Sequence, residues 1–362
     1  MKTILSLSAL LITLTLTAQS NTATWYLNNT SGNGIQSPTS TASGNFSNAL
    51  GFQTIASGVH STAMGNQTTA SGKWSTAMGY DALASGDGSL AAGIYVNASG
   101  VYSTAVGLFT TSSGYGSTAI GDNTTASGFN STSMGIDTEA SGDYSTAMGF
   151  ISNAIGMYSV AIGATNNSTG YASTTLGDAN LASGRASTAI GAGTIAEDYG
   201  MFTIGSWSKA LDNPSPELFS YTNTAFLIGN GADADNRSNA VQILFDGTTT
   251  IAGDLSINSD ARLKANIISL GSTLAKLLQI DGKTYTMKKD ENKKQKIGVL
   301  AQDIEKVFPE LVSESNGVKS VNYQGLVPVL INALKEQQAE IDRLKTQEKR
   351  LDRLERLVAA MN

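Results

Sequence analysis

Hydrophobic and polar positions recur every 14 residues along the first half of the chain. A Ser-x-Ala-x-Gly pattern begins in degenerate form at Ser47 and recurs in phase, without an insertion, until Ser187-Thr-Ala-Ile-Gly191, which makes eleven copies. A second glycine series, from Gly44 to Gly184, keeps the same period. A fixed short period indicates one structural unit stacked on itself.

Each repeat has the composition of one coil with two short strands and two tight turns. The glycines stand seven apart and supply the positive φ that we expect each turn to need. Between them, side chains alternate between two faces of a strand. The residue before each motif glycine forms a mostly apolar ladder: Leu50, Met64, Met78, Ala92, Val106, Ile120, Met134, Met148, Ile162, Leu176 and Ile190. We expect this ladder inside the coil, and its strict phase disfavours a flexible Gly/Ser linker.

A single coil of this composition is short of buried apolar surface. Ordering one coil costs roughly 20 kcal/mol at about 1.5 kcal/mol per residue. Apolar burial alone would offset this only with about 800 Å² per coil. Coils of Ala, Ser, Thr and one larger residue therefore predict that several chains associate.

The repeats resemble a known head domain. Ser159-Val-Ala-Ile-Gly163 fully matches an S-V-A-I-G type motif, and most other copies have Thr in place of Val. On this basis residues 43–206 are similar to the head of trimeric autotransporter adhesins. The resemblance implies a left-handed parallel β-roll in each chain, three rolls packed side by side, and an exposed location. It implies no particular ligand.

The N-terminus has the layout of a secretory signal peptide over residues 1–18. Met1-Lys2 precedes an apolar run from Ile4 to Leu16, and cleavage fits after Ala18. That run is short for a membrane span, and no later segment is apolar enough to cross a bilayer. The absence of cysteine excludes disulfides and thiol chemistry. We expect a secreted or cell-surface protein, with residues 19–42 as an N-terminal cap and no membrane span in the mature chain.

Charge divides the chain near residue 258. Residues 19–258 carry a net charge of −11 and residues 259–362 a net charge of +4. An acidic Ser/Thr-rich rod lacks the lysines and arginines that neutralise phosphates. Nucleic acid is therefore not expected as a partner.

Residues 207–258 predict a β connector. Its strands are expected at Ala225–Gly229, Val241–Phe245 and Thr248–Ile251. Asp233 and Asp235 have part of the spacing of a calcium loop, but the downstream Gly and the bidentate Glu of an EF-hand are missing. We expect a solvated turn there, a surface position for His60, and no metal or cofactor site.

Five ordered blocks follow residue 258. They are Ser259-Asp-Ala-Arg-Leu-Lys264, Gly282-Lys-Thr-Tyr285, Lys296 to Asp303, Phe308-Pro-Glu-Leu-Val312 and Lys319-Ser-Val-Asn-Tyr323. Together they resemble the endosialidase-type intramolecular chaperone domain of phage tail spikes and fibres. The resemblance implies a domain over residues 259–326 that acts as a serine peptidase and cuts its own chain once. It implies Ser259 as nucleophile, Lys264 as general base and Asn258–Ser259 as the scissile bond.

A Ser–Lys pair is chemically reasonable for such a cut. Serine needs a base to take its proton, and lysine can act as that base where burial lowers its pKa. The C-terminal part holds no histidine, which excludes a Ser-His-Asp triad. Residues five apart lie about 140° apart on a helix and on opposite faces of a strand. Ser259 and Lys264 can therefore meet only across a turn or bend, or between neighbouring chains.

Residues 327–362 predict a C-terminal coiled-coil helix. Its seam, with a phase slip near residues 345–348, comprises Val327, Leu330, Leu334, Gln337, Ile341, Leu344, Leu351, Leu354, Val358 and Met361. About five heptads fit a trimer.

These patterns predict a mainly β, fibre-like homotrimer: a parallel β-roll, a β connector, a small α+β chaperone domain and a coiled coil. The expected activity is a single-turnover serine autopeptidase with no external substrate and no cofactor. A second hypothesis is a structural adhesin that keeps the C-terminal domain attached as an inactive trimer cap. A third, a glycan-degrading fibre, is weak because the roll shows no paired carboxylates typical of a glycosidase. A host-surface or glycan ligand of the head is not specified.

Overall fold

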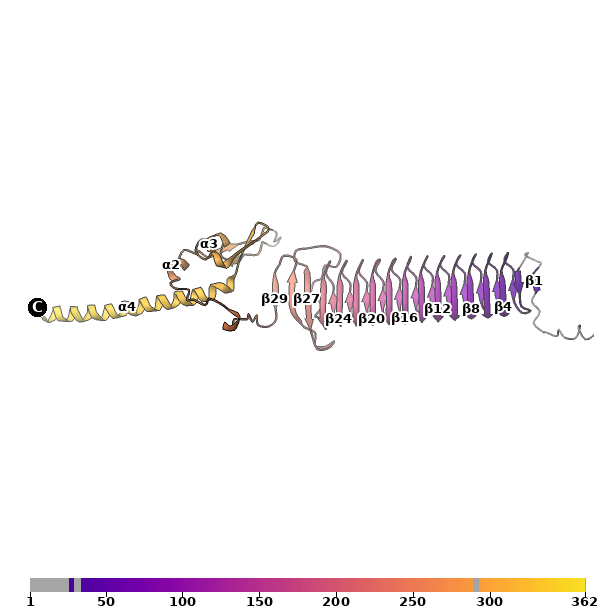
Figure 1. The fold of residues 1–362 in the computed structure, drawn as a ribbon, viewed down its shortest axis with the longest axis horizontal. Helices are drawn as coiled ribbons and strands as arrows, with labels where there is room; N and C mark the ends of the chain where they lie inside the picture. The colour runs from indigo at the N-terminus through magenta and orange to yellow at the C-terminus, as the bar shows by residue number, and fades with distance from the viewer. Residues whose placement is uncertain (1–25, 29–33, 289–292, 362) are drawn as a thin grey trace, which may run out of the picture. The chain divides into compact units, whose positions relative to one another are not determined.

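The computed structural model describes residues 26–28, 34–288 and 293–361. The chain divides into two compact units, residues 1–254 and residues 255–362. The first is a β-solenoid, and the second is a small α+β unit that ends in a long helix (Figure 1). The fold class predicted from the repeats is confirmed. The expected signal peptide lies outside the described residues, as does part of the expected cap over 19–42.

The solenoid is built from two parallel sheets. Figure 1 shows the strands of the larger sheet side by side, in the order of the chain. Its repeat strands are β4 (Asn48–Phe52), β6 (Thr62–Asn66), β8 (Thr76–Tyr80), β10 (Leu90–Ile94), β12 (Thr104–Leu108), β14 (Thr118–Asp122), β16 (Thr132–Ile136), β18 (Thr146–Phe150), β20 (Val160–Ala164), β22 (Thr174–Asp178), β24 (Thr188–Ala192) and β26 (Phe202–Ser206). Each strand pairs in parallel with the next, and the register places Gly107 opposite Gly121.

The smaller sheet consists of two-residue strands on the other side of each coil. They are β3 (Thr41–Ala42), β5 (Ile55–Ala56), β7 (Thr69–Ala70), β9 (Leu83–Ala84), β11 (Asn97–Ala98), β13 (Thr111–Ser112), β15 (Thr125–Ala126), β17 (Glu139–Ala140), β19 (Asn153–Ala154), β21 (Asn167–Ser168), β23 (Leu181–Ala182) and β25 (Ile195–Ala196). These strands also pair in parallel, one coil to the next.

Both ends of the larger sheet continue beyond the repeats. At the N-terminal end, β1 (Tyr26–Asn28) pairs antiparallel with β2 (Gly34–Gln36), which pairs in parallel with β4. At the other end, β27 (Thr224–Asn230) pairs in parallel with β26, and β28 (Asn239–Leu244) and β29 (Thr249–Ile251) follow antiparallel. The expected connector strands therefore extend the larger sheet.

The solenoid core consists of small side chains. Ala105 and Ala119 are fully buried, and hydroxyl residues such as Ser117 fill further inward positions. The apolar ladder that we expected inside lies outside, with Met64 38% and Leu176 44% exposed. Successive side chains of a strand point to opposite faces. Because the narrow coil has room only for the Ala of each motif inside, the larger residue that follows it points outward. The ladder from Leu50 to Ile190, the outer apolar ladder, therefore lies on the outer face of the larger sheet.

Glycine is required in each coil for two different reasons. At Gly121 φ is 139°, and a Cβ would lie 1.9 Å from the carbonyl oxygen of Gly135. At Gly100, in the second series, φ is not in the positive range, but a Cβ would lie 2.0 Å from the Gly114 carbonyl oxygen. The expected positive φ is therefore right for the motif glycines and wrong for the second series. In that turn the positive φ falls two residues later, as at Tyr102 (φ 58°).

The second unit surrounds a core of Ile304, Phe308 and Val329. Its elements are the 3-10 turn η1 (Ala261–Leu263), α2 (Leu274–Leu277), β30 (Lys283–Tyr285), β31 (Lys296–Gly298), α3 (Ala301–Val307), η2 (Pro309–Leu311), β32 (Val312–Ser315), β33 (Val318–Val321), η3 (Tyr323–Gly325) and α4 (Leu326–Met361). The strands form two antiparallel pairs, β30 with β31 and β32 with β33.

The predicted C-terminal helix is α4, a single helix of 36 residues. Val329 and Ala333 of α4 are buried in the unit's core. Most of the predicted seam points away from that core, and Leu334 and Leu351 are 67% and 56% exposed. In the described part of the chain, no helix combines the length and hydrophobicity that a membrane span requires.

Candidate functional site

The side chains of Ser259 and Lys264 meet at the start of the second unit. The Nζ of Lys264 donates a hydrogen bond to the Oγ of Ser259 at 2.7 Å. Between them lies η1, in which the backbone N–H of Lys264 donates to the Ala261 carbonyl. This turn reverses the chain enough for residues five apart to touch. The sequence left two ways for the pair to meet, a turn within one chain or a contact between neighbouring chains. In this structure a turn within one chain brings them together.

Asp260 and Arg262 hold this turn in place. A carboxylate oxygen of Asp260 accepts the backbone N–H of Arg262 at 2.9 Å, which caps the first turn of η1. The Arg262 guanidinium donates to both oxygens of the same carboxylate. The hydrogen bonds from the Arg262 side chain, and then from its backbone, lower the pKa of Asp260 below its ordinary value. Sequence reasoning assigned these two residues no role, although Asp before a short helical turn is a recognisable capping signal.

The predicted scissile bond, Asn258–Ser259, lies in an irregular stretch. Residues 254–260 form no helix or strand, and every side chain from 250 to 270 is exposed. A peptide bond in such a stretch is accessible to attack. Ser259 and Lys264 are also exposed within the single chain, so the chain alone does not provide the burial that lysine-base chemistry requires.

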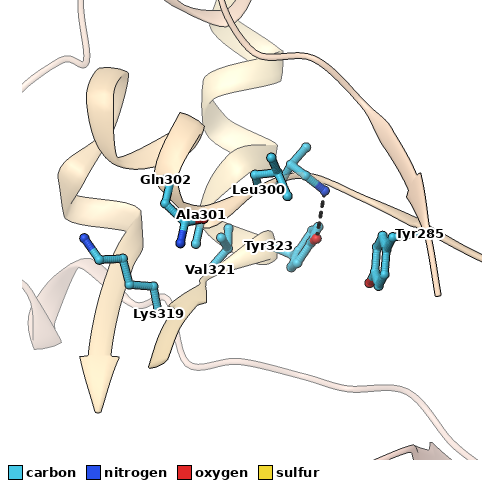
Figure 2. A pocket seen from close by; sticks show the side chains of 8 residues that line it. Tyr285, Leu300, Ala301, Gln302, Lys319, Val321 and Tyr323 are labelled. Carbon is cyan, nitrogen blue, oxygen red and sulfur yellow. Dashed lines mark hydrogen bonds between the residues drawn. The ribbon is translucent and has the colours of Figure 1, made fainter. Parts of the chain in front are cut away.

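Three of the five sequence blocks converge on a pocket of about 290 Å³ in the second unit (Figure 2). The Val299 N–H donates to the Tyr323 hydroxyl at 3.2 Å, which joins the segment before α3 to the segment after β33. Lys319 forms an ion pair with Glu305, and this hydrogen bond raises the pKa of Lys319. Lys319 is therefore held as a cation and lacks the free electron pair of a base. The predicted nucleophile and base do not line this pocket.

Glu336 on α4 binds the start of α2. Its carboxylate accepts hydrogen bonds from the Ser272 hydroxyl at 2.6 Å and from the backbone N–H groups of Thr273 and Leu274. The hydrogen bond from Ser272, followed by that from the Thr273 backbone, lowers the pKa of Glu336. Glu336 thus links two elements more than 60 residues apart in the sequence, a contact that no local pattern predicts.

The remaining sequence candidates lie in the first unit. Asp233 accepts hydrogen bonds from the backbone N–H groups of Asp235 and Asn236, as in a solvated turn. His60 stacks on Phe46 with ring centroids 5.0 Å apart. Across residues 26–28, 34–288 and 293–361, no group of three or more His, Cys, Asp or Glu side chains could hold a metal ion.

Comparison with known families gives two matches on different parts of the chain. The family described as "Chaperone of endosialidase" matches residues 259–313. The "YadA head domain repeat" matches five segments between residues 56 and 166. The first match begins at Ser259, and it covers the Ser259–Lys264 turn and the Lys296 to Asp303 block.

Curated relatives are long tail fibre proteins of phages. The chain is 34% identical over 108 residues to the long tail fiber protein Gp37 of Salmonella phage S16, a match covering 27% of this chain and 14% of the relative. It is 34% identical over 128 residues to the protein of the same name from Enterobacteria phage M1, covering 31% of this chain and 51% of the relative. The matches thus span about half or less of these relatives.

Most of the stacked coils between residues 56 and 166, and the Ser259–Lys264 turn, fall within separate family matches. The chain therefore joins YadA-type head repeats to a C-terminal chaperone-of-endosialidase segment, and it is similar to phage long tail fibre proteins.

Proposed function

We propose that this protein is a trimeric, fibre-like surface protein whose C-terminal unit assists assembly and then cuts the chain between Asn258 and Ser259. The observation that carries the proposal is the 2.7 Å contact between Lys264 Nζ and Ser259 Oγ beside an exposed peptide bond. The family match beginning at Ser259 supports the same reading.

The outer face of the larger sheet supports association of chains. The outer apolar ladder supplies a Met, Leu, Ile or Val side chain in ten of eleven coils, with Ala92 as the exception. Exposed apolar surface of this continuity marks an interaction site in a stable protein. The coil core holds mainly Ala, Ser and Thr, so burial of the ladder between chains would add the large apolar side chains that each coil lacks.

The α4 seam supports association at the other end of the chain. Leu351, Leu354 and Val358 are each at least half exposed, at the three- and four-residue spacing of a coiled coil. In a trimer these side chains would be buried against one another. We therefore expect both units to contribute to assembly.

The proposed chemistry needs only groups of this chain and water. The Ser259 Oγ attacks the Asn258 carbonyl carbon while Lys264 takes the hydroxyl proton. The Asn258–Ser259 C–N bond breaks as the Ser259 nitrogen receives a proton, leaving Asn258 attached to Oγ as an ester. Water then hydrolyses the ester and gives an Asn258 carboxylate and a new N-terminal Ser259.

Assembly would bury Lys264, which is exposed in the single chain. Lys264 donates to Ser259 in this structure, whereas a general base must accept a proton. Removing water from around an ammonium group disfavours its charged form. Packing of neighbouring chains over the exposed segment from 250 to 270 would therefore activate Lys264, and cleavage would follow trimer formation.

The names of the phage relatives favour a fibre displayed outside a cell or particle. Secretion through the predicted signal peptide belongs to this proposal, and so does the homotrimer. The hypothesis of a non-cleaving trimer cap predicts the same assembly without a cut.

Variants of the full chain separate these two functions. Ser259→Ala and Lys264→Ala should both leave the chain whole. Lys264→Arg should also leave it whole, because arginine can donate to Ser259 but stays protonated. Leu334→Asp with Ile341→Asp should reduce trimer yield and cleavage together. Efficient cleavage in a demonstrated monomer would contradict the coupling, and an uncut wild-type trimer would favour the permanent cap.

A further inference from the structure

A row of aromatic rings follows one edge of the solenoid, at the turn from the smaller sheet into the larger sheet. Six consecutive coils contribute one ring each, with neighbouring centroids 5.1 to 5.7 Å apart. This aromatic row consists of Tyr102, Tyr115, Phe129, Tyr144, Tyr158 and Tyr171. Each ring is 38% to 58% exposed. At the end of the row, the Arg185 guanidinium lies 4.3 Å from the centre of the Tyr171 ring.

Turn geometry alone does not explain the row. Tyr102, Tyr144 and Tyr158 occupy a turn position with φ between 57° and 60°, which bulky side chains rarely adopt. Glycine takes that position in another coil, at Gly116, and there the ring moves to the adjacent Tyr115. Every coil of the row thus keeps a ring, even where the backbone favours glycine.

The surroundings of the row define the chemistry of a partner. Exposed hydroxyl residues precede four of the six rings by two or three positions: Ser99, Ser113, Ser127 and Thr169. Residues 99–171 contain no Lys or Arg and four Asp or Glu. A stacking platform for nucleic acid needs a positively charged groove, and other polyanions are repelled in the same way. The surface therefore suits an uncharged partner with many hydroxyl groups.

We propose that the aromatic row binds an extended, neutral glycan chain lying along the solenoid axis. The C–H groups of a pyranose carry a partial positive charge and match the negative face of an aromatic ring. Sugar hydroxyls at the same time reach tyrosine and serine hydroxyls. The six coils place the first and last rings about 24 Å apart at ~4.8 Å per coil, so binding involves several sugar units and strengthens with chain length.

A second copy of this chain fits the row less well. The outer apolar ladder on the larger sheet provides the Met, Ile and Leu surface that buried contacts between chains use. The row combines tyrosine with serine, the composition of adaptable surfaces that bind polar ligands. The proposal does not depend on self-cleavage, because the row lies entirely within the repeats.

The test uses the full chain and two matched double variants. Tyr144→Gly with Tyr158→Gly removes a stacked pair, and the equivalent turn position already holds glycine at Gly116. The control, Tyr95→Gly with Phe109→Gly, removes a stacked pair at the other turn of the coil, where glycine is native at Gly193. Both changes relieve positive φ, so both variants should keep the solenoid fold.

Binding is measured to immobilised gluco-, manno-, galacto- and N-acetylglucosamine oligosaccharides, with oligogalacturonate as the anionic comparison. We expect wild type and control to bind at least one neutral hexasaccharide more tightly than its disaccharide, and the row variant to bind about tenfold more weakly. Absence of neutral binding, preference for the anionic probe, or equal loss in both variants would overturn the proposal. Loss of the trimer in the row variant alone would make the row a subunit interface and overturn it as well.

Discussion

The Nζ of Lys264 lies 2.7 Å from the Oγ of Ser259, although the two residues are five apart and neither a continuous helix nor a strand could bring them together. The contact exists because a single 3-10 turn, Ala261–Leu263, separates them. The geometry of the proposed site therefore depends on what stabilises that turn.

Asp260→Ala should slow self-cleavage by about 10- to 100-fold, because it removes the cap of this turn and displaces Lys264 from Ser259. The rate is measured by gel densitometry during folding of the full chain. Asp281→Ala is the matched control, since Asp281 also pairs with a basic residue two positions later but lies outside the turn. Equal rates for the two variants would show that the Asp260 cap is not required.

The Asp260–Arg262 contact should also be visible in a titration. Because the pKa of Asp260 is lowered, the turn gains stability from the ionised carboxylate above about pH 4 and loses it as the pH falls through the lowered value. NMR titration of the Asp260 carboxyl in a Ser259→Ala chain should give a midpoint below the ordinary one. The midpoint should return toward the ordinary value in Arg262→Ala. Identical midpoints in the two chains would contradict this pairing.

Glu336→Gln should loosen α2, because it weakens the charged acceptor for Ser272, Thr273 and Leu274. Amide exchange at Thr273 and Leu274 should accelerate by about tenfold or more above pH 5. Since the pKa of Glu336 is lowered, the protection in wild type should persist above the ordinary value and disappear as the pH falls through the lowered one. Glu340→Gln, one turn further along α4, should leave α2 unchanged.

Ile120→Asp with Met134→Asp should prevent assembly of the repeats while leaving each coil intact. Both side chains lie on the outer face of the larger sheet, where charge would be buried between chains. Thr111→Asp with Thr125→Asp places the same charges on the outer face of the smaller sheet and serves as the control. Sedimentation in a Ser259→Ala background should show a trimer for the control alone. A trimer in both would exclude the outer apolar ladder as the interface.

Sequence periodicity was sufficient to predict the solenoid, because a strict 14-residue repeat leaves one stacking register. Periodicity did not determine which face of each strand points inward, because the alternation is equally satisfied with Ala63 inside or with Met64 inside. Coil width decides that choice, and width is a property of the stacked backbone. The same limit applies to Gly100, whose need for glycine comes from the carbonyl of the next coil rather than from its own φ.

The candidate site divides in the same way between local and distant causes. Ser259, Lys264 and the order of the blocks could be predicted because they lie in short contiguous motifs. The pairing of Glu336 with Ser272 could not be predicted, because the two residues are 64 apart in the sequence and no repeating pattern relates them. In the mechanism that we propose, the environment that turns Lys264 into a base comes from neighbouring chains, and a single sequence does not specify their packing.

The central claim is tested most directly by intact mass and N-terminal sequencing of the purified wild-type protein after folding. We predict two products, one ending at Asn258 and one beginning with Ser259, and a single uncut chain for Ser259→Ala. A wild-type trimer that stays whole, or a cut at any other bond, would contradict it.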